Sequence, residues 1–167
     1  STFANRAQLP VLLDTAFPDF YKQPLETEEQ IFAIDESMIA FVEKNIKDQT
    51  TEKGKITELV KAIFDRTQLS LYYNANANTT ATETFYGGTA NCLSLTILTF
   101  SMTQHMGLRS AFQDVDIPEY WTRRSGSTFI NRHINLKVKP RNSRVLSLTR
   151  APIVVDFDPQ QGMRKFT

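Results

Sequence analysis

The sequence is poor in the side chains that carry nucleophilic and acid–base chemistry near neutral pH. It has one cysteine, Cys92, and two histidines, His105 and His133. A single cysteine excludes an internal disulfide, although it does not fix the redox compartment. No signal peptide is visible and no apolar run is long enough to cross a bilayer, so we expect no membrane span.

The chain also lacks repeats, low-complexity tracts and any large excess of charge. With 167 residues, of which 41% are hydrophobic and 22% charged, we expect one folded domain that needs no disulfide or metal for its core. Three prolines within residues 1–25 indicate an irregular lead-in, which leaves residues 26–167 as the domain.

The net charge of +1 conceals two halves of opposite sign. Residues 1–83 carry 13 acidic and 8 basic side chains (−5), whereas residues 109–150 carry 9 basic and 3 acidic ones (+6). A basic half suits nucleic acid, but it suits equally two lobes that pack together or stay solvated. Because no nucleic-acid-binding motif accompanies the charge, we expect no nucleic-acid partner.

Helical patterns precede strand patterns along the chain. Apolar spacing predicts helices over residues 28–48, after a T-x-x-Q capping box at Thr27, and over residues 52–66. Residues 69–73 suggest a short extended segment, residues 74–84 a polar loop with one helical turn near its end, and residues 119–127 a second loop. Strands are predicted at residues 109–115, 129–138, 145–149 and 153–155. This order favours an α+β fold with an antiparallel sheet.

Between the two groups lies an uncharged apolar stretch from Leu93 to Met106, preceded by the loop Tyr86–Asn91 and by Cys92. Its apolar residues surround the helix axis, which predicts a buried central helix that ends at Gly107. At about 15 residues it is too short for a membrane span. Cys92 begins this helix, where the positive end of the helix dipole favours a thiolate.

A cysteine nucleophile needs a base, and the base needs a group that orients it. His105 lies on the same helix, 13 residues from Cys92 or about 20 Å along the axis, so it cannot serve as that base. His133 and Asp156 lie on predicted strands and complete a candidate Cys–His–Asp triad. Asp158 shares the strand parity of Asp156, but Pro159 indicates that Asp158 belongs to a turn.

Four motifs in this order resemble the transglutaminase-like superfamily. The stretch Gly87–Leu95 is similar to its nucleophile motif, and Met106–Ala111 to the glycine and strand that follow. Arg132–Val138 resembles its histidine strand, and Ile153–Asp156 its aspartate strand. The resemblance covers about residues 30–160 and is closest to bacterial members in which the domain precedes tetratricopeptide repeats. Such a C-terminal repeat domain would be an implied partner, and both bacterial cytoplasm and periplasm fit.

The resemblance implies a papain-like α+β fold, with the cysteine helix packed on an antiparallel sheet. It implies a protein or peptide substrate and cofactor-free cleavage or transfer at amide or ester bonds through an acyl-cysteine. Cys92 would be the nucleophile, His133 the general base and acid, and Asp156 the orienting carboxylate. The backbone N–H of Cys92 would hold part of the oxyanion. Ile134 departs from the family pattern, which has an aromatic residue after the histidine.

Less specific interpretations compete with each of these assignments. Asn91, Tyr86, Trp121 and Asn135 are candidates for an oxyanion donor or a cleft wall, and no motif decides among them. Trp121 could equally anchor a loop, and His105 is expected to be structural. A lone cysteine in an apolar stretch is often an inert core residue, so a catalytically inactive interaction module is the main alternative. A zinc site is disfavoured because no ligand pair is clustered.

Overall fold

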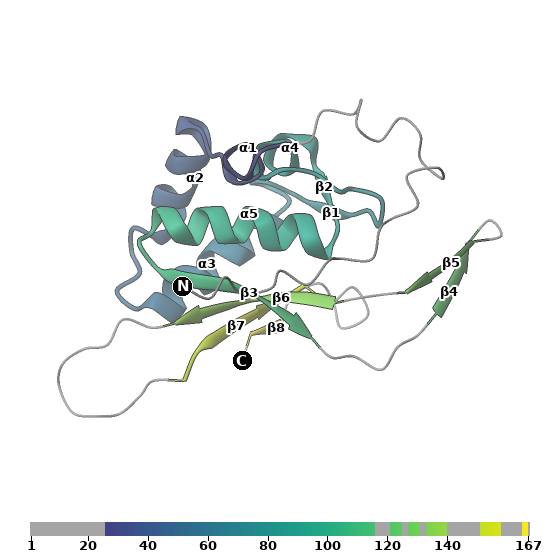
Figure 1. Ribbon diagram of the computed structural model, residues 1–167. Coiled ribbons are helices and arrows are strands. Elements are labelled where there is room, and N and C mark those ends of the chain that lie inside the picture. Colours follow the sequence, from purple (N-terminus) through teal and green to yellow (C-terminus); the bar gives the residue numbers. More distant parts are fainter. Residues whose placement is uncertain are drawn as a thin grey trace, which may run out of the picture.

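The computed structural model describes residues 26–115, 121–124, 127–130, 133–139, 151–157 and 165–166. The predictions of an irregular lead-in at residues 1–25 and of a strand at residues 145–149, together with Asp158, lie outside these residues. The described part is an α+β structure in which helices cover one face of an antiparallel sheet (Figure 1). The predicted fold class is thus confirmed at the level of α+β.

The helices lie in the first two thirds of the chain. Their bounds are α1 Glu28–Phe32, α2 Glu36–Ile46, α3 Glu52–Phe64, α4 Ala81–Gly87 and α5 Cys92–His105. The single helix predicted over residues 28–48 is wrong, because the chain becomes extended at Ala33 (ψ 137°) and α2 starts anew. Asp35 provides the new start by accepting a hydrogen bond from the backbone N–H of Met38 at 2.9 Å.

The strands form one larger sheet and two small pairs. They are β1 Tyr72–Tyr73, β2 Thr89–Ala90, β3 Arg109–Val115, β4 Trp121–Arg124, β5 Ser127–Ile130, β6 His133–Lys139, β7 Ile153–Asp156 and β8 Lys165–Phe166. The larger sheet has the order β3-β6-β7-β8 and is antiparallel throughout, as predicted. β1 and β2 form a short parallel pair in addition.

One predicted loop and one predicted strand are corrected. The loop expected over residues 119–127 contains β4, which pairs with β5 in antiparallel fashion. The strand expected over residues 129–138 is two strands, because β5 pairs with β4 whereas β6 pairs with β3 and β7. Three consecutive polar residues, Asn131 to His133, interrupt the apolar alternation between Ile130 and Ile134, and this interruption marks the change of partner in the sequence.

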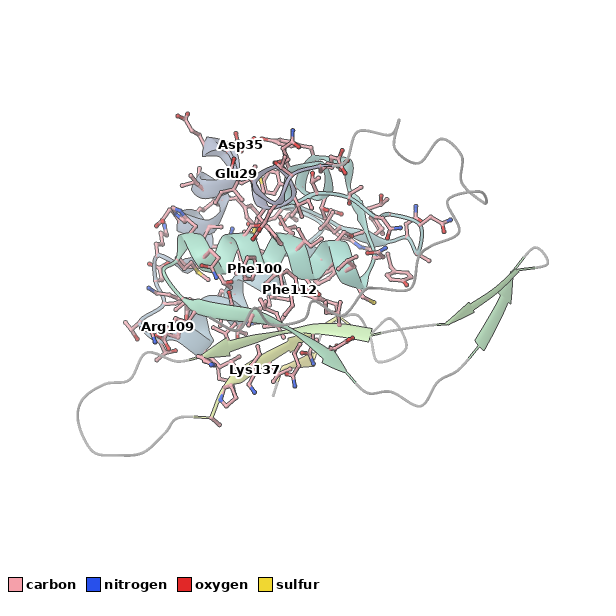
Figure 2. All side chains as sticks on the ribbon, in the orientation of Figure 1. Glu29, Asp35, Phe100, Arg109, Phe112 and Lys137 are labelled. Carbon is pink, nitrogen blue, oxygen red and sulfur yellow. The ribbon has the colours of Figure 1, made fainter. Side chains whose placement is uncertain are left out.

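α5 lies between the sheet and the helices α1, α2 and α4, and it is buried on almost every side (Figure 1). Toward the sheet, the rings of Phe100 and Phe112 pack with centroids 4.8 Å apart, and both side chains point into the layer between α5 and β3 (Figure 2). Toward the other helices, Phe100 packs on Phe32 of α1 at 5.0 Å. A single hydrophobic cluster therefore joins the helices to the sheet.

The two layers differ in charge. Residues 26–83, which build α1 to α3 and the start of α4, carry 11 acidic and 6 basic side chains, or −5. Glu29 and Asp35 lie on this helical side, whereas Arg109 and Lys137 lie on the sheet (Figure 2). Among the described helices, none is both long enough and apolar enough to traverse a bilayer.

Candidate functional site

Cys92 is the first residue of α5, and a network of hydrogen bonds fixes the helix end that carries it. Asn91 accepts from the backbone N–H of Ser94 at 2.9 Å, while the Ser94 hydroxyl accepts from the backbone N–H of Asn91 at 2.8 Å. This reciprocal capping box satisfies donors that the first helical turn leaves without a partner. The half-buried thiol thus stands at a rigid, electropositive helix terminus.

The cap is tied in turn to the segment that precedes α4. The Asn91 side-chain amide donates to Asn78 Oδ1 at 2.7 Å and to the backbone oxygen of Ala75 at 3.3 Å. Both amide hydrogens of Asn91 therefore have acceptors inside the protein, and its oxygen is taken up by Ser94. The side chain predicted as an oxyanion donor is occupied in positioning the helix.

The parallel pair β1–β2 holds the loop that leads to the thiol. The backbone N–H of Tyr72 donates to Gly88 at 3.0 Å, and that of Asn74 to Ala90 at 2.8 Å. Gly88 ends α4 with φ +72°, a left-handed conformation in which a side chain would be strained. The glycine loop recognised in the sequence is thus a sharp stop between two helices.

The relation between Cys92 and His133 follows from the packing of α5 on β3. Thr103 contacts Ser110 and Phe100 contacts Phe112, so the helix runs antiparallel to the strand. From Phe100, Cys92 is eight residues or about 12 Å along the helix.

The C-terminal end of β3 lies at a similar distance from Phe112, in the same direction as Cys92 lies from Phe100. Val115 is three residues or about 10 Å beyond Phe112 along the strand, and it pairs with His133. The start of α5 and the start of β6 therefore lie at the same end of the two layers, as Figure 1 shows.

Asp156 ends β7 at this same end of the sheet. Leu136 pairs with Val155, so in the antiparallel register Asp156 is adjacent to Asn135 and diagonal to His133. Diagonal backbone positions on neighbouring strands are about 7–8 Å apart. The side chains of His133 and Trp121 lie outside the described part.

At this end of the β6–β7 pair, Asn135 and Asp156 lie on the outer side of the sheet. Leu136 and Val155 are buried on the face that packs on α5, and alternation puts Asn135 and Asp156 on the opposite face. Cys92 and Asp156 therefore stand at one end of the molecule but on different sides of the sheet. Any group that links them must lie at the margin where β6 begins.

Asn135 is buried although its strand neighbour Gln113 is exposed. Its side chain is 7% exposed, and its Oδ1 has no hydrogen-bond partner among the described residues. Buried acceptors without a partner are uncommon in folded proteins. Of the four predicted cleft residues, Asn135 is the one whose described polar atom is left unused.

Tyr86 is more distant from this chemistry than the sequence suggested. It is 59% exposed, and its hydroxyl donates to Asp35 Oδ2 at 2.6 Å, which joins α4 to the start of α2. The hydrogen bond from Tyr86, with that from the backbone of Met38, lowers the pKa of Asp35. The same hydrogen bond raises the pKa of Tyr86. Its hydroxyl thus has a structural partner.

His105 occupies the opposite end of α5 from Cys92. Its Nε2 lies 2.8 Å from Glu43 Oε1 of α2. This contact agrees with the expected structural role. Within the described ranges, no group of three or more histidine, cysteine, aspartate or glutamate side chains is arranged to hold a metal ion.

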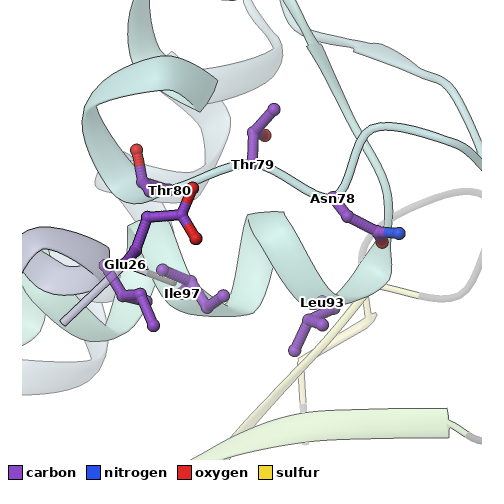
Figure 3. A pocket seen from close by; sticks show the side chains of 7 residues that line it. Glu26, Asn78, Thr79, Thr80, Leu93 and Ile97 are labelled. Atoms are coloured by element: carbon purple, nitrogen blue, oxygen red, sulfur yellow. The ribbon is translucent and has the colours of Figure 1, made fainter. Parts of the chain in front are cut away.

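A hollow that the sequence did not reveal opens at Leu93, the residue that follows Cys92. It has a volume of about 180 Å³ and is walled by α5, α1 and the segment before α4. Leu93 and Ile97, one helical turn apart, form its floor, while Glu26 and Thr80 face each other across the opening (Figure 3). Leu93 is 42% exposed, which its place in the apolar stretch did not indicate.

Comparisons with models of known protein families, with curated proteins and with solved structures found no significant match.

Proposed function

We propose that this chain is a thiol-dependent enzyme of the transglutaminase-like superfamily, with a papain-like arrangement of its α+β fold. The observation that carries the proposal is the placement of Cys92. It is a half-buried thiol at the start of a 14-residue helix, at the end of the molecule where β6 begins and β7 ends. The sequence resemblance assigns the histidine and the aspartate to those two strand ends.

The proposed reaction begins with attack of the Cys92 thiolate on the carbonyl carbon of an amide. His133 would hold the thiol proton and transfer it to the departing amine, while Asp156 orients the imidazole. Water or a second amine then attacks the thioester and releases Cys92. The chain would thus act on a protein or peptide as a protease, peptidase or amidase, or as an acyltransferase.

The helix end supports the first step. Positive potential at a helix N-terminus favours the thiolate, and the backbone N–H of Cys92 belongs to the turn in which donors face outward. Asn91 keeps this turn in place through three contacts to Ser94, Asn78 and Ala75. When the thiolate attacks, the oxyanion of the tetrahedral intermediate would develop next to these donors.

The test is the pH dependence of Cys92 alkylation by iodoacetamide. An activated thiol reacts at about pH 6, well below the ~8.5 at which a free cysteine ionises. His133→Ala should slow the reaction at pH 6, with a smaller effect from Asp156→Asn. His105→Ala is the matched control, because it removes a histidine bound to Glu43 at the other end of α5.

Reaction only above pH 8, unchanged by His133→Ala, would remove the enzyme proposal in favour of an inactive interaction module. One observation favours that second function: large apolar or aromatic side chains are exposed near the start of α5, namely Tyr72 (61%), Tyr73 (42%) and Leu93 (42%). Such side chains are common in surfaces that bind other proteins.

A further inference from the structure

The hollow at Leu93 has the size and lining of a subsite for one side chain. Its volume of about 180 Å³ is below the roughly 300–1,000 Å³ of pockets that hold a whole small molecule. Leu93, which directly follows Cys92, forms part of its floor. A residue bound here would belong to a substrate whose reacting carbonyl lies close to the thiol.

The lining combines an apolar floor with one charge. Ile31 of α1 joins Leu93 and Ile97 of α5 to form an aliphatic surface, and Glu26 is the only charged residue among the described residues that line the hollow. Glu26 is exposed, and Figure 3 shows its carboxylate directed across the opening toward Thr80. Such a lining suits a long aliphatic side chain with a positive end.

The other polar lining residues are already engaged. Asn78 accepts from Asn91, Thr79 shares a hydrogen bond with Thr84, and Thr80 caps α4 with Glu83 in a reciprocal pair. These contacts make the wall rigid. The carboxylate of Glu83, bonded to the backbone of Thr80 at 2.9 Å, adds a second negative charge near the rim.

We propose that this hollow is a specificity subsite that binds a lysine or arginine side chain of a peptide substrate, with Glu26 as the counter-charge. The inference rests on the proposed function only in treating the occupant as part of a substrate of Cys92. The surrounding layer, with its net charge of −5 over residues 26–83, would favour a cationic occupant over an acidic one.

Two affinity labels test the subsite. Acetyl-lysyl and acetyl-norleucyl chloromethyl ketones carry side chains of similar length and differ in the terminal charge. Each reacts when the Cys92 thiolate displaces chloride and forms a carbon–sulfur bond. An ion pair at a partly exposed site gives up to about 1 kcal/mol, so we expect the lysyl reagent to react about five-fold faster.

Glu26→Gln should bring this rate ratio close to one, whereas Glu29→Gln should leave it unchanged. Glu29 is the matched control, because it is an exposed glutamate of α1 that does not line the hollow. The reaction with iodoacetamide, which has no side chain to place, should be the same in all three proteins. High salt should lower the lysyl preference of the natural chain.

Labelling at pH 6 and at pH 9 distinguishes failure of the proposed subsite from failure of the proposed enzyme function. At pH 9 the thiol ionises without help while lysine stays charged, so the ratio reports on the hollow alone. A lysyl preference at pH 9 that depends on Glu26, with no reactivity at pH 6, would support the subsite and reject the enzyme. A ratio of one in the natural chain, or a preference that persists in Glu26→Gln, would overturn the subsite whatever happens at pH 6.

Discussion

Asn91 is the residue on which the thiol environment depends most directly. Its side chain caps α5 and bonds Asn78 and Ala75, and it is 8% exposed. We expect Asn91→Ala to reduce the free energy of unfolding by about 1–3 kcal/mol, because a cap and buried hydrogen bonds are lost together. Urea denaturation measures this loss. Thr27→Ala, which removes an exposed cap from α1, should cost less.

The variant Asn91→Asp keeps the helix cap but adds a negative charge, so it tests the effect of charge on Cys92. The carboxylate can still accept from the backbone of Ser94 but places a negative charge beside Cys92, which should raise the pKa of the thiol. We expect slower alkylation by iodoacetamide at pH 6 than in the natural chain and a shift of the rate profile to higher pH. An unchanged profile would show that the charge at the helix start does not govern the thiol.

For Asn135 we expect a substitution that increases the free energy of unfolding instead of lowering it. Its buried Oδ1 lacks a partner among the described residues, so Asn135→Leu should raise the free energy of unfolding by about 1 kcal/mol. If Asn135 lines the proposed cleft beside Asp156, the same change should slow alkylation of Cys92 at pH 6. Gln113→Leu, at the exposed position opposite on β3, is the control. Loss of stability in Asn135→Leu would contradict the prediction.

Among the elements, α4 and α2 are joined by an exposed contact whose strength should vary with pH. Tyr86 and Asp35 share a hydrogen bond of 2.6 Å, which lowers the pKa of Asp35 and raises that of Tyr86. The Asp35 contribution to stability is present above its unfolded pKa near 4 and is lost as the pH falls through its lowered folded value. The Tyr86 contribution is present below about pH 10 and is lost as the pH rises through its raised folded value.

Tyr86→Phe should therefore lower the melting temperature most between about pH 4 and pH 10, and less at either extreme. Melting curves of the two proteins at pH 2.5, 7 and 10.5 measure the difference. Tyr72→Phe, on a similarly exposed tyrosine of β1, should show no such dependence. A constant difference at all three values would mean that the hydroxyl acts through something other than Asp35.

The sequence predicted most reliably those elements whose residues decide their own structure. Leu93 to Met106 is apolar on all sides and is followed by Gly107, and α5 is found there. The break between α1 and α2 depends on Asp35, which caps one helix and receives Tyr86 from 51 residues away. A long-range contact of this kind leaves no local pattern, whereas the polar run Asn131 to His133 marks the change of partner between β5 and β6.

On the scale of the whole molecule, one hydrophobic cluster contains residues from the helices and from the larger sheet. Leu98, at the middle of α5, is fully buried in that cluster. We expect Leu98→Ala to reduce the free energy of unfolding by about 2–5 kcal/mol and to lower amide protection equally in α2, α3, β6 and β7. Hydrogen exchange measures both. Leu93→Ala, on the exposed side of the same helix, should change protection little.

The candidate site was predictable only in its chemical composition. Because the chain has a single cysteine, the sequence alone indicated Cys92 as the nucleophile. The distance along α5 excluded His105 as its base, which left His133. The arrangement of their strands did need them, since the register of β6 on β3 and β7 sets where His133 and Asp156 stand. The hollow was beyond prediction because Glu26, Thr80 and Leu93 come from three separate segments.

The hydrogen bonds of Asn91 with Asn78, Ala75 and Ser94 join residues at most 16 positions apart in the sequence. His133, in contrast, lies 41 residues beyond Cys92. Short-range contacts form faster than those that close a long loop, so the helix end that carries the thiol should form before the strand that carries its proposed partner. A nascent or partly folded chain would then present an accessible thiol with no imidazole beside it. Because oxidation follows thiolate character, the sensitivity of Cys92 to oxidants should increase once the strand that carries His133 has formed.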